Sequence, residues 1–169
     1  FPFAPPKLEM LPWDDVVRLS ASLHQSPGLR IRRVSLDSAA LDVFLEPGTD
    51  SDSVDALVTE LEPIKANITL LDLGQTTFSE ATLERIGTFL NLEQLRLHET
   101  PVTDQDILHL QDLRKLGKLN LYGTAITDAE AGHEPLAFDD LGDSEHQRGG
   151  EVARRAAMVL GSLDKIVSL

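Results

Sequence analysis

Pairs of leucines separated by one residue recur at a constant spacing through the middle of the chain. They lie in the segments 68–76, 92–100 and 116–124, each of which begins 24 residues after the one before it. The paired residues are Leu71 and Leu73, Leu95 and Leu97, and Leu119 and Leu121. Because the side chains of a strand point alternately to its two faces, each pair predicts a short strand with one buried face.

A second pattern follows the first two leucine pairs. Its apolar positions are three residues apart, at Leu83, Ile86 and Phe89 and then at Ile107, Leu110 and Leu113. This spacing predicts one to three turns of helix, α or 3₁₀, with one buried side. Ser79 and Asp104 precede these runs and are expected to cap them. Stacked units of this kind would bury their leucines together, as a parallel strand ladder with helices on the opposite face.

The first third of the chain is predicted to form an α+β cap followed by a degenerate first repeat. A helix is expected from about Pro12, where a proline and the acids after it suit a helix N-terminus. The expected buried positions of this helix are Val16, Leu19 and Leu23. Strands are predicted over 29–36 and 41–45. A further helix is predicted with Val54, Leu57, Leu61 and Ile64 on its apolar side.

The 24-residue pattern ends after Asp128. Its continuation would place apolar residues where the chain has Glu134, Asp140 and Asp143. Three interpretations stay open: a divergent C-terminal cap, a disordered tail, and a displaced reading frame in the gene. The predicted organisation is a linker over 1–10, the cap and degenerate repeat over 11–53, the repeats over 54–128, and the divergent cap or disordered tail over 129–169.

The three leucine segments resemble leucine-rich repeats. They share the pattern Leu-x-x-Leu-x-Leu-x-x-Thr, with Ile68 at the first position of the first segment, and two of them continue with Val or Ile, Thr and Asp. Thr76, Thr100 and Thr124 stand where many such proteins carry asparagine, and their hydroxyls are expected to bond neighbouring backbone groups. The resemblance implies an α/β fold, a short leucine-rich-repeat solenoid with the N-terminal α+β cap.

A narrower resemblance is carried by the segments 92–104, 119–128 and 34–45. They are similar to the repeat module of planctomycete-type bacterial proteins that also contain a c-type cytochrome domain. This resemblance implies one module of a larger, membrane-anchored bacterial protein in the periplasm or elsewhere outside the cytoplasm. A cytoplasmic location is also compatible with the sequence. No Cys-x-x-Cys-His motif occurs, so the chain is expected to attach no haem itself.

Charge and composition narrow the range of partners. The 169 residues include 28 Asp and Glu and 15 Lys and Arg, which gives a net charge of −13. This balance repels phosphate, so no nucleic-acid partner is expected and a basic partner protein is favoured. No apolar run is long enough to span a membrane, so we expect no direct membrane insertion. The chain has no cysteine, which excludes disulfides, thiolate catalysis and cysteine-ligated metals.

Motifs for catalysis and cofactor binding are missing from the sequence. There is no glycine-rich phosphate loop and no serine in a Gly-x-Ser-x-Gly setting. The five histidines are His24, His98, His109, His133 and His146. None of them has a second histidine four residues away, as a helical zinc site requires. We therefore expect no catalytic residue, no metal and no cofactor, and we predict that the protein is not an enzyme.

A single basic cluster stands out against this acidic background. It consists of Arg30, Arg32 and Arg33 in the first predicted strand. Strand alternation places Arg30 and Arg32 on one face and Arg33 on the other. The cluster is either a contact for an anionic partner or lipid headgroup, or a set of local ion pairs with the abundant acids.

The candidate binding surface is the concave strand face, turned away from the predicted helices. Its predicted binding residues are Asp72, Gln94, Arg96, His98, Glu99, Lys118, Asn120 and Tyr122. Paired strands would hold these side chains in rows, about 4.8 Å apart from strand to strand. We predict a non-catalytic interaction module whose partner is a protein that docks here. The alternatives are a structural spacer, or an enzyme with its site in the N-terminal segment or the acidic tail.

Overall fold

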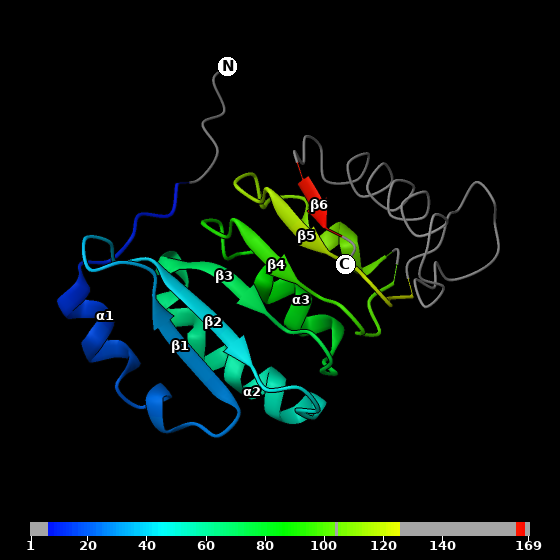
Figure 1. Ribbon diagram of the computed structural model, residues 1–169, viewed down its shortest axis with the longest axis horizontal. Coiled ribbons are helices and arrows are strands. Elements are labelled where there is room, and N and C mark those ends of the chain that lie inside the picture. Colours follow the sequence, from blue (N-terminus) through cyan, green and yellow to red (C-terminus); the bar gives the residue numbers. More distant parts are fainter. Residues whose placement is uncertain (1–6, 104, 126–164, 168–169) are drawn as a thin grey trace, which may run out of the picture.

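Strands predicted from the apolar alternation lie side by side in one sheet. The computed structural model describes residues 7–103, 105–125 and 165–167. In this part of the chain the strand order is β1-β2-β3-β4-β5-β6, with β1 antiparallel to β2 and all other neighbours parallel. The bounds are β1 Leu29–Arg33, β2 Leu41–Leu45, β3 Ile68–Asp72, β4 Gln94–Arg96, β5 Lys118–Asn120 and β6 Lys165–Val167 (Figure 1). The predicted α/β class, with a largely parallel sheet, is confirmed.

The 24-residue spacing becomes the register of the parallel strands. Leu71 lies beside Leu95, and Leu95 lies beside Leu119. All six leucines of the three pairs are fully buried, as predicted. Because the same residue of each unit meets its counterpart in the next, one buried row of leucines runs across β3, β4 and β5.

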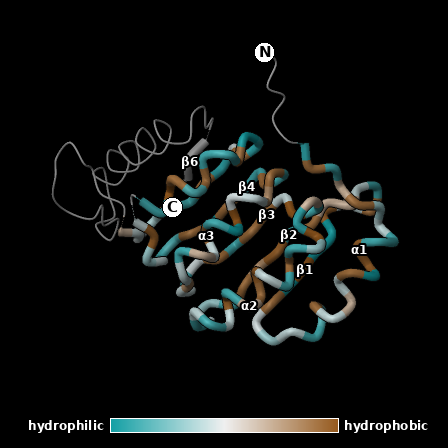
Figure 2. Tube along the Cα trace, turned by 180° about the vertical axis from the view of Figure 1, so that it is seen from behind, coloured by the Kyte–Doolittle hydropathy of each residue, from teal (hydrophilic) through white to brown (hydrophobic). Residues whose placement is uncertain are grey.

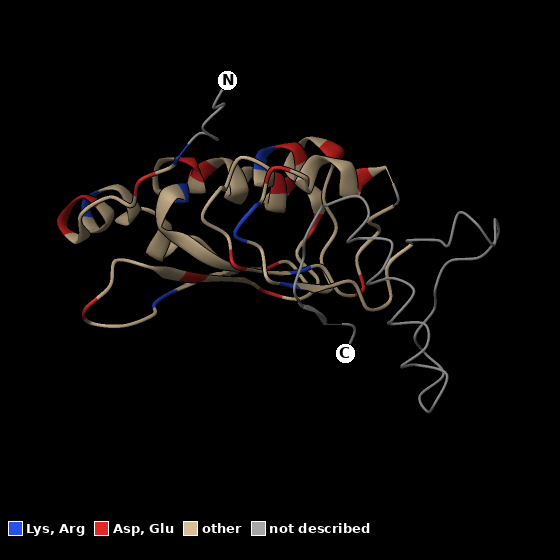
Figure 3. Cartoon of the chain, turned by 90° about the horizontal axis from the view of Figure 1, so that it is seen from above, with Lys and Arg blue, Asp and Glu red and all other residues tan. Residues whose placement is uncertain are grey.

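Helices cover one face of the sheet, as the second apolar pattern predicts. They are α2 (Ser51–Leu61), the 3₁₀ helix η2 (Glu62–Asn67), α3 (Glu80–Ile86) and the 3₁₀ helix η3 (Asp106–Leu110). Every apolar position of the spacing-by-three pattern is buried, from Leu83 to Leu113. Figure 2 shows that apolar residues follow the strands and recur in the helices. Figure 3 shows the helices together on one side of the sheet.

The N-terminal prediction is confirmed in outline and wrong in two details. Helix α1 (Trp13–Ser20) and the 3₁₀ helix η1 (Leu23–Gln25) precede β1, and Val16 and Leu23 are buried. Leu19, expected in the core, is 39% exposed because this helix buries only a narrow side against its neighbours. The strand expected over 29–36 ends at Arg33, where the chain turns toward β2.

Hydrogen bonds at matching positions of successive units support the sheet. The hydroxyls of Thr76, Thr100 and Thr124 donate to the carbonyls of Leu73, Leu97 and Leu121, over 2.6, 2.6 and 2.8 Å. These bonds confirm the predicted role of the hydroxyls, and all three threonines are buried. At the other end of the strands, Asn67 and Asn91 donate to the carbonyls of Ala39 and Ala66. Each of these bonds satisfies a backbone oxygen that burial would otherwise leave unpaired.

A left-handed backbone position also recurs every 24 residues. Gln75 and Glu99 have φ values of 59° and 53°, and Gly123, one unit later, has 66°. The N–H of Gln75 donates to the carbonyl of His98, and that of Glu99 donates to the carbonyl of Tyr122. The turn after each strand is therefore tied to the equivalent turn of the next unit.

The predicted capping by Ser79 is wrong in its mechanism. Ser79 stands at the N-cap of α3, but its side chain makes no capping hydrogen bond. The cap comes from α2 instead, because Asp55 Oδ1 accepts from the Ser79 N–H at 3.1 Å and from the Thr82 hydroxyl. The cap predicted at Asp104 lies outside the described residues.

Several other expectations fall partly or wholly outside the described part of the chain. In the predicted linker, the carbonyl of Leu8 accepts from Asn91 Nδ2 at 2.7 Å, whereas Lys7, Glu9 and Met10 are exposed. Of the region 129–169, the structure describes β6, which pairs in parallel with β5. For the rest of this region the three interpretations, a divergent cap, a disordered tail and a displaced reading frame, all stay open. His133 and His146 lie outside the described residues. No helix among the described residues is long and apolar enough to cross a membrane.

Candidate interaction surface

Two rows of side chains cross the sheet on the face opposite to the helices. The first row consists of Arg30, Phe44, Asp72, Arg96 and Asn120. The second row consists of Arg32, Asp42, Leu70, Gln94 and Lys118. We call these ten side chains the open face. Within each row, neighbouring residues are paired in the strand register, so both rows extend from β1 to β5.

The two carboxylates of the open face are both engaged by arginines. Arg96 Nη1 lies 3.3 Å from Asp72 Oδ2 on the adjacent strand, and Arg32 pairs with Asp42 across β1 and β2. Arg32 also lies over the Phe44 ring, 5.5 Å from its centre. The Asp42 and Asp72 side chains are only 11% and 18% exposed, whereas those of Arg32 and Arg96 are 69% and 45% exposed. The cationic groups therefore reach further into solvent than the carboxylates that pair with them.

A third set of side chains lies where β3, β4 and β5 end. His98 packs over Gly74, and a Cβ at Gly74 would lie 1.9 Å from His98 Cε1. The glycine therefore provides the space for the imidazole of the next unit. Nδ1 of His98 is buried, and among the described residues it is the one buried side-chain polar atom without a hydrogen-bond partner.

Polar side chains at the same end of the sheet hold its turns in place. Asp72 Oδ1 accepts from the N–H of Gly74 at 2.9 Å, and Asn120 Oδ1 accepts from the N–H of Tyr122 at 3.0 Å. The Gln75 amide donates to the Glu99 carboxylate. Such short-range bonds order the ends of the strands, so the turns that follow β3, β4 and β5 have a defined conformation.

The eight predicted binding residues fall into two groups. Asp72, Gln94, Arg96, Lys118 and Asn120 belong to the open face. The other three, His98, Glu99 and Tyr122, lie in the turns that follow β4 and β5. His98 and Tyr122 are only partly exposed, whereas Glu99 is exposed.

Sequence reasoning missed that the open face continues onto β1 and β2. Phe44 lies beside Asp72 and Asp42 beside Leu70, while Arg30 lies beside Phe44. The 24-residue spacing does not reach these strands, and the pairing shifts by one residue at Leu41 and Asp42. The alternation of apolar residues and arginines over 29–32 was the available signal for this extension.

The basic cluster divides as strand alternation predicts. Arg30 and Arg32 belong to the open face, whereas Arg33 lies on the other side of β1, 3.9 Å from the centre of the Trp13 ring. Arg33 also donates to the carbonyls of Ser38 and Leu36. Its guanidinium is thus used inside the domain. Arg32 forms a local ion pair with Asp42, and Arg30 makes no ion pair in the described part of the chain.

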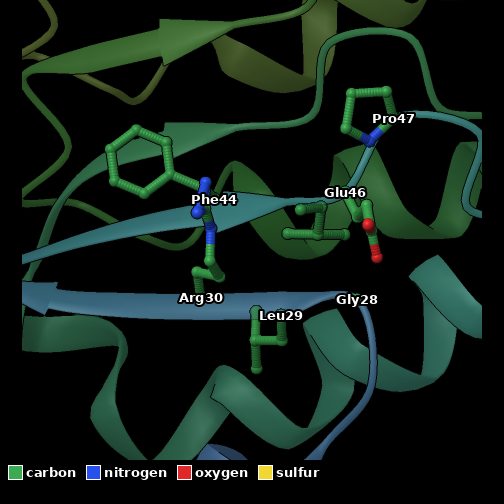
Figure 4. Close-up of a pocket in the computed structure, with 7 residues that line it drawn as sticks. Gly28, Leu29, Arg30, Phe44, Glu46 and Pro47 are labelled. Atoms are coloured by element: carbon green, nitrogen blue, oxygen red, sulfur yellow. The ribbon is translucent and has the colours of Figure 1, made fainter.

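A shallow pocket of about 300 Å³ lies at the Leu29 end of β1, near Arg30. It is lined by Gly28, Leu29, Arg30, Phe44, Leu45, Glu46 and Pro47. Figure 4 shows Arg30 reaching from β1 toward Phe44 on β2. The lining contains one cation, one carboxylate and apolar groups, which is not an arrangement typical of acid–base or nucleophilic catalysis.

One group of potential metal ligands occurs on the helix side. Oxygens of Glu80 and Glu84 and a ring nitrogen of His109 lie within 4.8 Å of one another. His109 Nε2 lies 3.0 Å from Glu80 Oε1, so a side-chain hydrogen bond accounts for this contact. The sequence did not predict the group because its ligands come from two units. An exposed group of this size does not by itself indicate a metal centre.

Among the described residues, two carboxyl groups have clearly lowered pKa values, and both accept hydrogen bonds at the start of a helix. Burial raises the pKa of Asp55, but hydrogen bonds from Thr82 and Ser79 outweigh this effect and bring the pKa below its ordinary value of 3.8. Hydrogen bonds from Ser53 lower the pKa of Asp50, which caps α2. Both shifts stabilise ionised capping groups and do not mark a site of proton transfer.

Comparisons with known proteins do not assign the chain to a family. A scan against protein-family models and a search of the curated proteins each found no match.

Proposed function

We propose that this chain is a non-catalytic protein-interaction module that binds its partner on the open face and the adjoining turns. The observation that carries the proposal is the pair of continuous side-chain rows across β1 to β5. Strand pairing already orders the backbone that carries these side chains, so little backbone entropy is lost when a partner binds, which favours this face over flexible segments. Arginine and tyrosine, present here as Arg30, Arg32, Arg96 and Tyr122, are frequent among residues that dominate binding energies.

We further propose that the fold is a short leucine-rich-repeat solenoid. Four features recur at 24-residue spacing and support it: the leucine pairs, the buried threonine hydroxyls, the bonded asparagines and the left-handed turns. Repeats that stack in register present a continuous strand face, a surface that such proteins commonly use for binding. The resemblance to repeat modules of cytochrome-domain proteins supports a place in a larger, extracytoplasmic bacterial protein.

The proposal is tested with the full chain as bait in extracts of the native host. A partner captured by the wild-type chain is then measured against two variants. Tyr122→Ala/Asn120→Ala changes the strand side, and Glu84→Ala/Arg114→Ala changes exposed residues near α3 and η3. We expect about tenfold weaker binding for the first variant, the effect of losing contacts at the centre of an interface. The second variant should bind within about twofold of the wild type. The reverse order of effects would contradict the proposal.

A spacer role makes a different prediction. A spacer would leave every partner affinity unchanged by either pair of substitutions, whereas shortening the chain would alter its function. The double row of charged and polar side chains favours binding over spacing, because a spacer does not require complementary charges in register.

A further inference from the structure

The open face carries a charge opposite to that of the whole chain. Among its ten side chains there are four cations, Arg30, Arg32, Arg96 and Lys118, and two carboxylates, Asp42 and Asp72. The chain as a whole has a net charge of −13. Figure 3 shows Asp and Glu at several places in the helix layer, on the other side of the sheet. The net charge of the chain is therefore a poor guide to what this face would bind.

The cationic side chains of the open face are also more exposed to solvent than its carboxylates. The side chains of Asp42 and Asp72 are 11% and 18% exposed. Those of their partners Arg32 and Arg96 are 69% and 45% exposed. Arg30 and Lys118 are exposed and make no ion pair with a residue in the described part of the chain. Within the open face the guanidinium and ammonium groups are therefore more accessible than the carboxylates, while the exposed Glu46 and Glu99 lie at its margins.

The spacing of the cations suits an extended chain that crosses the strands. Arg30 and Arg32 lie on β1, Arg96 on β4 and Lys118 on β5. Four strand spacings of about 4.8 Å separate β1 from β5, a span of about 19 Å. An extended peptide rises about 3.3 Å per residue, so about six residues would reach from one group of cations to the other.

We infer that the open face binds an extended acidic segment of a partner protein, whose carboxylates pair with Arg30, Arg32, Arg96 and Lys118. This inference rests on the proposed function and specifies its partner. It replaces the basic partner expected from the net charge, because electrostatic complementarity acts over short distances. At physiological ionic strength the screening length is about 8 Å, so the acids behind the sheet contribute little.

The inference is tested with the full chain and a labelled deca-glutamate peptide, by fluorescence anisotropy at physiological ionic strength, where the acids behind the sheet are screened. The variant Arg30→Gln/Lys118→Gln removes two cations without breaking an ion pair of the described structure. The control Lys7→Gln/Arg114→Gln removes two exposed cations that lie off the open face. Thermal melts establish that both variants fold. We expect the open-face variant to bind the peptide about fivefold more weakly, and the control to bind within about twofold of the wild type.

Further probes separate the possible failures. Absence of deca-glutamate binding, or an equal loss in both variants, would overturn the inference. So would tighter binding of a ten-nucleotide oligothymidylate with the same dependence on Arg30 and Lys118, which would indicate a nucleic-acid partner. If deca-lysine binds instead and is weakened by Tyr122→Ala, the face is a docking site and only the charge of its partner is wrong. If no probe responds to any open-face substitution, the proposed function fails as well.

Discussion

The helix-side face of the sheet and the open face are built from alternating residues of the same strands, yet they have different neighbours. Leu97, on the helix side, is fully buried, and Arg96, the residue before it, has a side chain that is 45% exposed. On the helix side, contacts between units involve backbone atoms and buried side chains. On the open face they involve ion pairs and side chains at the surface. We infer that the first set provides stability, while the second can vary with the partner.

Glycines on the two sides illustrate the difference. A Cβ on Gly87 would lie 2.1 Å from the carbonyl oxygen of His109, a backbone atom that can move only with η3. A Cβ on Gly74 would meet the ring of His98, a side chain that can rotate. The helix side therefore tolerates less change than the open face, and the following predictions test this comparison.

The largest effect is expected for Leu97→Ala. This substitution should lower the free energy of unfolding by about 2–5 kcal/mol, the usual cost of emptying the site of a buried leucine. Chemical denaturation of the wild type and the variant measures the difference. Leu36→Ala is the matched control because Leu36 is 86% exposed, and it should change stability by less than about 0.5 kcal/mol. A cost below about 1 kcal/mol for Leu97→Ala would contradict the stacking of units.

Gly87→Ala should lower the free energy of unfolding by a smaller amount, about 1–3 kcal/mol, because the added methyl group must push α3 away from η3. Gly117→Ala is the control, since a Cβ there meets no atom within 4 Å. The loss of stability of Gly74→Ala should lie between those of Gly87→Ala and Gly117→Ala, because the His98 side chain can rotate away from an added methyl group. Equal stabilities of the three variants in thermal melts would show that the two faces do not differ in this way.

The capping carboxylate of Asp55 is expected to contribute about 1 kcal/mol at neutral pH, and Asp55→Ala should remove it. Its pKa in the folded protein is below the ordinary value of 3.8. The contribution is therefore complete above pH 3.8 and is lost as the pH falls through the lower, folded-state pKa. Denaturation curves at several pH values should show the wild type and Asp55→Ala converging under acidic conditions. Asp112→Ala, at an exposed position, should show no such convergence.

The smallest effect on stability is expected for Arg96→Gln, which removes the ion pair with Asp72. Exposed ion pairs contribute about 0–1 kcal/mol, so denaturation should barely distinguish this variant from the wild type. The same variant should weaken binding of the deca-glutamate peptide. A loss of stability above about 2 kcal/mol would show that the open face is part of what holds the fold together.

The sequence by itself determined which residues of the repeated units are buried. Leu95, Leu97, Ile107 and Leu110 were identified from spacing alone, because burial of one face imposes a period of two on strands and a near-helical period on helices. The backbone hydrogen bonds of the repeated threonine hydroxyls were predicted from their constant position after each strand. These features depend on local geometry, and they repeat wherever the local pattern repeats.

The tertiary structure alone decided which side chains meet across units and which charges reach solvent. The pairing of Asp55 with Ser79 and of His109 with Glu80 joins residues that are 24 and 29 positions apart. The extension of the open face to Arg30 depends on an antiparallel strand and on a shift in register at Leu41 and Asp42. Net charge could not predict the sign of this face. Electrostatic interactions depend on distance and exposure, and only the fold places the arginines above the carboxylates that pair with them.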